Sequence, residues 1–163
     1  MRMFVFYSVM LLILCIMNGL IAQKELLKAS CQIIYLQLAP VDPRSLMMGD
    51  YMSLNYDLNN KARGKATGDG SLVVKLDDKK IGTFVGVYSG APLNSDERLM
   101  LFRERSGMVQ VGPPAFYFQE GHANHYSGAK YGKLLVANDG TCLLVGLCDE
   151  KLVRLGPAGS SDY

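Results

Sequence analysis

The sequence predicts an all-β fold, an antiparallel meander forming a small barrel or sandwich, preceded by one N-terminal transmembrane helix. An uncharged apolar segment occupies residues 3–23. Short runs of alternating apolar and polar residues follow it, separated by turn-forming pairs such as Asp139-Gly140. Such runs are typical of half-buried strands that are joined by hairpins. No segment after the apolar one has a helical period, and 163 residues fit one domain.

The N-terminal segment is long enough to cross a membrane. It lies between Arg2 and Lys24 and carries no charge. About 20 helical residues span the hydrocarbon core of a bilayer, whereas the apolar region of a secretory signal is usually about 7–15 residues long. The best cleavage site, after Ala22, has the bulky Leu20 where a small residue is preferred. We therefore expect residues 1–23 to be an uncleaved signal anchor, and a cleaved signal peptide is the alternative.

The orientation of this anchor depends on the charges beside it. Arg2 lies on one side, whereas Lys24 and Lys28 lie on the other, so the positive-inside rule slightly opposes a cytoplasmic N-terminus. The very short N-terminal tail nevertheless favours translocation of the C-terminal domain. We expect an extracytoplasmic β domain at residues 24–157 and a disordered tail at residues 158–163.

The first elements after the anchor are strands. Residues 31–41 alternate as a strand does until Pro40 interrupts them. Residues 52–58 predict a half-buried strand, with Met52, Leu54, Tyr56 and Leu58 on the core face. Residues 59–70 are rich in glycine and basic residues and predict a mobile hairpin loop. The other strands are expected at residues 71–77, 81–89, 98–105, 108–112, 115–119, 131–138 and 141–147, with a last short one at 151–155.

The connections between these strands have recognisable turn chemistry. Residues 77–80 form a turn, and both Ser106-Gly107 and Asp139-Gly140 predict hairpins. Residues 91–97 predict a turn in which Asn94 or Ser95 caps one helical turn. Residues 121–130 predict a loop or a single helical turn.

The four cysteines permit at most one bridge within the domain. Cys15 lies in the apolar segment, and Cys31, Cys142 and Cys148 remain. Cys142 and Cys148 are too far apart to pair if they share one continuous strand. Cys31 could therefore pair with one of them, and buried free thiols are an equally good interpretation.

Charge and motif content argue against several classes of site. The net charge is +2 and the basic residues are scattered, so no nucleic-acid partner is expected. The glycines at 64, 68 and 70 lack the context of a phosphate loop, and no small-molecule cofactor is expected. His122 and His125 with Glu120 could approach a metal, but two histidines cannot form a three-histidine site, and we expect none. Arg103 and Arg105 are expected to end an edge strand.

The richest stretch is DPRSLMMGDYMSLNYDL at residues 42–58. Asp42, Pro43 and Arg44 suit a tight turn, and Gly49 permits a positive φ before the strand. Asp50 is expected to accept hydrogen bonds from backbone N–H groups or Arg44 and so tie the loop to the strand. By strand parity, Tyr51 faces away from the core, opposite Leu54 and Tyr56. A structural role of this stretch is favoured over a functional one.

Residues 49–56 read G-D-Y-x-x-L-x-Y and thereby resemble the GDYXXLXY family of membrane-anchored proteins. The blocks LAPVDPRSLMMGDYM, GSLVVKLD, FYFQEGHA and YGKLLVANDGTCLLVGL extend the resemblance from about residue 24 to about residue 157. It implies one N-terminal anchor and an extracytoplasmic domain in bacteria, periplasmic in a Gram-negative. It also implies association with multi-spanning membrane proteins and no known enzymatic activity. Lys130 stands where the family pattern has arginine, and His125 lies outside the matching block.

We therefore expect a non-catalytic binding or assembly partner of an envelope protein or a multi-spanning membrane protein. The alternative is a carboxylate-based hydrolase acting on an envelope substrate, in which Asp50 works with Glu120 or Asp42. Two carboxylates suffice for such chemistry when they are held about 5–9 Å apart. No catalytic residue is assigned. The residues singled out for binding are Asp42, Arg44, Gly49, Asp50, Tyr51, Leu54, Tyr56, Glu120 and His122.

Overall fold

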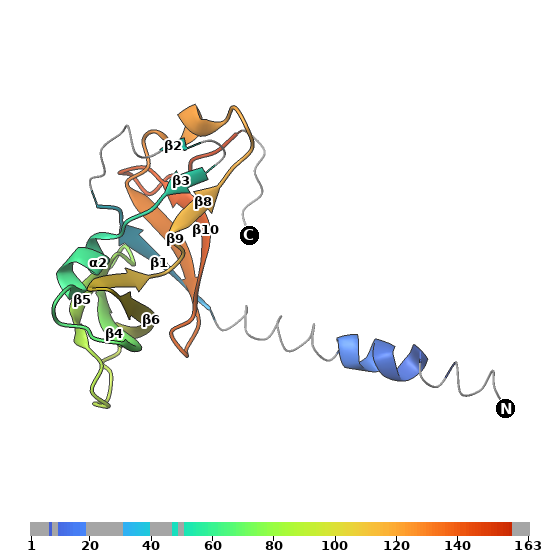
Figure 1. Cartoon of the computed structure of the whole chain (residues 1–163), viewed down its shortest axis with the longest axis horizontal. Helices are drawn as coiled ribbons and strands as arrows, with labels where there is room; N and C mark the ends of the chain where they lie inside the picture. Colours follow the sequence, from blue (N-terminus) through green and yellow to red (C-terminus); the bar gives the residue numbers. More distant parts are fainter. Residues whose placement is uncertain (1–6, 8–9, 19–30, 40–46, 49–50, 158–163) are drawn as a thin grey trace. The chain divides into compact units, whose positions relative to one another are not determined.

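The structure, a computed structural model, describes residues 7, 10–18, 31–39, 47–48 and 51–157 (Figure 1). The chain divides into two compact units, residues 1–31 and 32–163. In the first, residues 10–18 are helical, and their large apolar side chains are exposed. Within the described ranges, no helix has both the length and the apolar character that a membrane crossing needs. Much of the predicted anchor lies outside these ranges.

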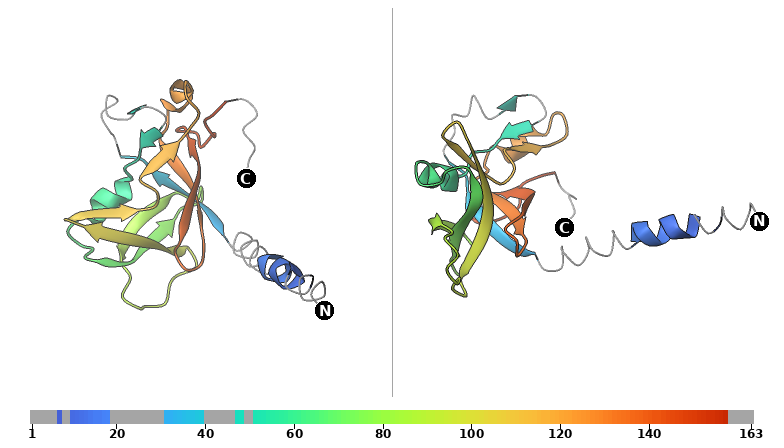
Figure 2. Two further views of the ribbon diagram at one scale, coloured as in Figure 1. Left: turned by 45° about the vertical axis from the view of Figure 1, so that its right-hand side comes forward. Right: turned by 60° about the horizontal axis from the view of Figure 1, so that its bottom comes forward.

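The described residues of the second unit form three antiparallel sheets and two short helical segments, which confirms the expected β-rich, antiparallel fold (Figures 1 and 2). The first sheet has the order β1-β9-β10, the second β2-β3-β8 and the third β5-β4-β6-β7. The strands are β1 (Gln32–Gln37), β2 (Met47–Met48), β3 (Tyr51–Ser53), β4 (Asp69–Leu76), β5 (Gly82–Val87), β6 (Glu97–Arg105), β7 (Met108–Val111), β8 (Ala115–Tyr117), β9 (Tyr131–Val136) and β10 (Cys142–Cys148). The helical segments are α2 (Asp57–Ala62) and the 3-10 turn η1 (Ala123–Tyr126).

The strands do not follow one another as a simple meander, so that part of the prediction is wrong. Among the described strands, four pairings join consecutive strands, β2–β3, β4–β5, β6–β7 and β9–β10, but β1 pairs with β9 and β3 pairs with β8. These two pairings join segments that are far apart along the chain. Alternation within a strand specifies which face is buried but contains nothing that selects a distant partner.

The segment predicted as one strand at residues 52–58 is a strand followed by a helix. β3 ends at Ser53, and α2 begins at Asp57. The burial pattern was nevertheless predicted correctly, because Met52, Leu54, Tyr56 and Leu58 are all buried. The first three lie on extended backbone, whereas Leu58 reaches the core from the inner face of α2.

The predicted mobile loop at residues 59–70 is also wrong at both ends. Residues 59–62 belong to α2, where Asn59 and Ala62 are buried, and β4 already begins at Asp69. The cause is tertiary, because α2 contacts both β5 and β7, the two edge strands of the four-stranded sheet. The Asn59 Oδ1 atom accepts a hydrogen bond of 2.9 Å from the Val111 backbone N–H on β7. α2 therefore covers edges that would otherwise be open.

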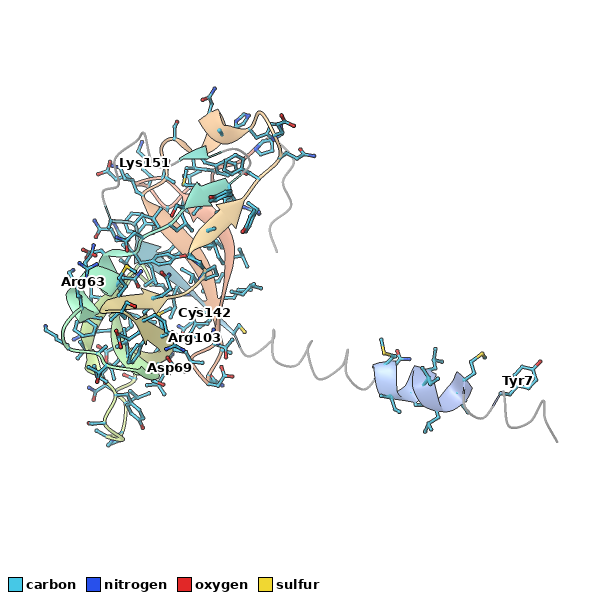
Figure 3. All side chains as sticks on the ribbon, in the orientation of Figure 1. Tyr7, Arg63, Asp69, Arg103, Cys142 and Lys151 are labelled. Atoms are coloured by element: carbon cyan, nitrogen blue, oxygen red, sulfur yellow. The ribbon has the colours of Figure 1, made fainter. Side chains whose placement is uncertain are left out.

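Three smaller expectations are corrected. β6 is an interior strand, so Arg103 and Arg105 do not end an edge. Arg105 instead forms a bidentate pair with Asp69, with N–O distances of 2.7 and 3.2 Å. Its guanidinium lowers the pKa of the Asp69 carboxyl. Figure 3 labels Asp69 on β4 and Arg103, the residue opposite it on β6. Residues 151–155 contribute only a single bridge, from Arg154 to Cys148. Residues 91–97 contain no helical turn; the Glu97 carboxylate accepts the Asn94 N–H at 2.9 Å.

The predicted hairpin tips are confirmed. Ser106 and Gly107 join the paired residues Arg105 and Met108, and both have positive φ angles, 54° and 79°. Asp139 and Gly140 lie in the connection between β9 and β10, where the Asp139 carboxylate accepts bonds from the N–H and hydroxyl of Thr141. Turn residues could be identified because their conformational requirements are local.

None of the four cysteines forms a disulfide, so the structure supports the interpretation without a bridge. Cys142 and Cys148 are the first and last residues of the single strand β10, as expected for cysteines that cannot pair with each other. Only Cys148 is fully buried.

The turn between β4 and β5 stores backbone strain at Lys80. This exposed residue has a φ of 61°, while the Asp77 Oδ1 atom accepts the N–H groups of Lys79 and Ile81. A left-handed conformation costs a non-glycine residue about 1–2 kcal/mol, and glycine loses about 0.5–1 kcal/mol more conformational freedom on folding. Lys80→Gly is therefore expected to raise the free energy of unfolding by up to about 1 kcal/mol, measured by urea denaturation. Lys79, whose φ is not positive, provides the control: Lys79→Gly should lower the free energy of unfolding. If both variants lowered the free energy of unfolding, the backbone strain at Lys80 would be contradicted.

Candidate functional site

The described residues of the G-D-Y-x-x-L-x-Y motif divide between the core and the surface, as their parity predicts. Leu54 and Tyr56 are buried, whereas 36% of Tyr51 is exposed on the opposite face of the sheet. The Leu54 N–H donates to the Pro114 carbonyl oxygen at 2.7 Å, which continues the pairing of β3 with β8. The motif thus carries both a structural part and a surface part.

Tyr56 is the centre of the structural part. Its side chain is fully buried, and its hydroxyl donates a hydrogen bond of 3.2 Å to the carbonyl oxygen of Pro113. Its ring covers Gly112 and Gly132, where an added methyl carbon would lie 3.4 and 3.0 Å from ring atoms. Burial, and secondarily the nearby Cys142, raises the pKa of the Tyr56 hydroxyl. The hydroxyl therefore stays protonated and acts as a hydrogen-bond donor in the core.

The surface part is a pair of tyrosines on neighbouring strands. Tyr51 on β3 lies directly opposite Tyr117 on β8, and their ring centroids are 5.7 Å apart with the planes tilted by 40°. Tyr117 is 75% exposed, although it is a large aromatic residue on a strand. We call Tyr51 and Tyr117 the tyrosine pair. Sequence reasoning missed Tyr117, because only the register of β3 with β8 brings it beside the motif.

An aromatic cluster supports the tyrosine pair from the core side of the same sheet. Phe116 and Phe118 alternate with Tyr117, and each contacts the ring of Tyr126 on η1, with centroid distances of 5.1 and 5.2 Å. Tyr126 itself is buried. These contacts hold β8 and η1 together and make the sheet beneath the tyrosine pair a packed layer.

The residues considered for a metal lie on and before η1. The rings of His122 and His125 contact each other edge to face at a centroid distance of 5.4 Å, and Glu120 is exposed. In the part of the chain that the structure describes, no group of three His, Cys, Asp or Glu residues is placed to hold a metal ion.

Other residues singled out from the sequence lie outside the described ranges: Asp42, Arg44, Gly49 and Asp50. Met48 and Tyr51, which flank Gly49 and Asp50 in the sequence, pair with each other across β2 and β3. The expected hydrogen bonds of Asp50, and its distance from Glu120 or Asp42, stay predictions.

Lys130, which departs from the family pattern, acts here through its backbone. Its N–H donates to the Cys148 carbonyl and its own carbonyl accepts the Leu38 N–H, each at 2.8 Å. These two bonds connect the ends of β10 and β1. Neither bond involves the side chain, which is exposed.

Comparison with known proteins adds one finding. The family model described as "GDYXXLXY protein" matches residues 13–147. Among curated proteins and among solved structures, none matches the chain.

Proposed function

The chain belongs to the GDYXXLXY family, and on that premise we propose that it is a membrane-anchored, extracytoplasmic binding protein. In this proposal it assembles with another envelope protein, such as a multi-spanning membrane protein, and catalyses no reaction itself. The uncharged segment at residues 3–23 supports the anchor, because its length suits a bilayer. The C-terminal domain would then lie in the periplasm of a Gram-negative cell.

The observation that carries the binding role is the tyrosine pair. Tyrosine is enriched in the energetically important centres of protein interfaces, because its ring offers a large apolar area and its hydroxyl a polar contact. Here 75% of Tyr117 is exposed above a layer packed by Phe116, Phe118 and Tyr126. A partner could bury this ring without ordering the sheet beneath it, so the entropic cost of binding would be small.

The environment of Tyr56 supports a binding role over a catalytic one. Its hydroxyl is the motif group with a raised pKa, which in an open cleft would suggest an acid or base. This hydroxyl is instead bonded to Pro113 and enclosed by the core. The raised pKa of the Tyr56 hydroxyl is therefore a consequence of its burial in the core.

We also propose that the three sheets and α2 together form one small barrel. The Tyr35 N–H on β1 donates to the Lys80 carbonyl at 2.9 Å, which joins the first sheet to the edge of the third. α2 contacts both edges of the third sheet, β5 and β7. The sheets thus have connections at which a closed wall could be completed.

The proposal is tested by co-purification from membranes. The tagged full chain is expected to stay with membranes through an alkaline carbonate wash and, after detergent extraction, to retain a multi-spanning protein. Tyr117→Ala and Tyr51→Ala should each lower the recovery of that protein at least tenfold, since interface tyrosines often contribute about 2 kcal/mol. Met108→Ala is the matched control, because Met108 is 62% exposed and lies on β7. Equal recovery with all three variants, or release of the chain by carbonate, would contradict the proposal.

A further inference from the structure

We propose that the free edge of β8 pairs with β8 of a second copy of this chain. The resulting two-fold dimer would contain one continuous sheet, with β2, β3 and β8 from each copy. This inference goes beyond the proposed binding function and does not depend on it, because it uses the backbone of β8.

The register of β3 with β8 identifies which backbone groups are free. The Leu54 N–H donates to Pro114, and the pairing continues through Met52 with Phe116. In an antiparallel pair, residues alternate between bonding to the partner strand and directing their N–H and C=O groups away from it. Ala115 and Tyr117 therefore direct theirs toward the outer edge of β8. Within the described chain, neither residue has a hydrogen bond on that edge.

The free stretch of this edge is short and symmetric about Phe116. On one side, Pro113 has no N–H, and its carbonyl accepts the Tyr56 hydroxyl at 3.2 Å. On the other side, the Gln119 carbonyl accepts the His122 N–H at 3.1 Å. A longer strand from another protein would meet, beyond the free stretch, a proline without an N–H and two carbonyls that already accept a hydrogen bond. A second copy of β8, related by a two-fold axis at Phe116, satisfies the N–H and C=O groups of both Ala115 and Tyr117.

The side chains at the edge are complementary to themselves under this symmetry. Ala115 would face Tyr117 of the second copy, and Tyr117 would face Ala115 of that copy. The smallest side chain of β8, the half-buried Ala115, thus lies opposite the exposed Tyr117, so the two tyrosine rings do not collide. An isologous interface requires this kind of self-complementarity.

The edge strands of the other two sheets are covered, whereas the outer edge of β8 is not covered by any described residue. α2 contacts β5 and β7, and on β7 the Asn59 side chain occupies the edge N–H of Val111. On β10, the Leu147 carbonyl accepts the N–H of Leu155. An open edge is a template for pairing with another chain, and proteins normally cover it. The second copy would supply that cover for β8.

The dimer should be weak in solution. A free stretch of three residues buries less than the roughly 1,200–2,000 Å² of a standard interface, so a dissociation constant above about 1 μM is expected. Cross-linking is the appropriate test, because it captures a weak complex in a defined register.

The test uses two variants of the full chain, Ala115→Cys and Tyr117→Cys, each with one added cysteine. The two variant proteins are mixed in detergent micelles and oxidised. A hydrogen-bonded antiparallel pair has a Cα separation of about 5.5 Å, which suits a disulfide. Identical positions of the two copies would be about 8–9 Å apart, beyond disulfide reach. The oxidised mixture should give at least tenfold more covalent dimer than either variant alone, and the native cysteines contribute equally to all three samples. Equal yields would overturn the proposal.

A proline variant supplies an independent test. The Ala115 N–H points away from β3, so Ala115→Pro removes no bond within the sheet but blocks an added strand. In sedimentation equilibrium, it should raise the dimer dissociation constant at least tenfold relative to wild type, whereas Ala115→Ser should not. A wild-type chain that stays monomeric up to about 1 mM, or a proline variant that dimerises like wild type, contradicts the inference. Should the proline variant lose its fold, the cross-linking result alone decides.

Discussion

Tyr56→Ala is expected to lower the free energy of unfolding by about 3–5 kcal/mol, a large part of the stability of a domain this size. The side chain is fully buried, and its ring is the surface against which Gly112 and Gly132 pack. Removing the ring leaves a cavity beside two residues that have no side chains to fill it. Thermal and urea unfolding of the full chain measure the loss.

Two further variants separate the ring of Tyr56 from its hydroxyl. Tyr56→Phe keeps the ring and loses only the bond to Pro113, so it should cost about 0.5–1.5 kcal/mol. Gly132→Ala adds a methyl carbon 3.0 Å from the ring, and it should be less harmful in the Tyr56→Ala background than in wild type. Equal losses for Tyr56→Phe and Tyr56→Ala would show that the ring does not support the glycines.

Asn59→Ala is expected to lower the free energy of unfolding by about 1–3 kcal/mol, because it leaves a buried backbone N–H without a partner. Asn59 is the buried polar residue whose Oδ1 atom accepts the Val111 N–H, while its Nδ2 group donates to Asn55. The variant should also speed hydrogen exchange of the Val111 amide, since its edge of β7 opens.

The control for this variant lies next to it on the same helix. Asn60 is exposed, and alanine has the higher helix propensity, so Asn60→Ala should change stability by no more than about 0.5 kcal/mol. Unchanged exchange at Val111 in the Asn59→Ala variant would mean that Asn59 does not protect the β7 edge.

Part of the candidate site could be predicted from the sequence. The alternation of residues 51–56 placed Tyr51 at the surface and both Leu54 and Tyr56 in the core, and the structure agrees. Tyr117 could not be recognised, because it lies in a separate segment whose pairing with Tyr51 depends on register. Asp50 and Arg44 lie outside the described residues, and their expected hydrogen bonds stay a prediction.

The sequence by itself determined the β-rich class, the faces of β3, and the hairpin tips at Ser106-Gly107 and Asp139-Gly140. Each of these follows from neighbouring residues, through side-chain alternation or the φ angle that a turn needs. The tertiary structure alone decided the pairing of β1 with β9 and of β3 with β8. It also decided that residues 57–62 form α2. The physical reason is that a helix there buries Leu58 and Ala62 and bonds Asn59 to the edge of β7, and these gains come from contacts with residues far along the chain.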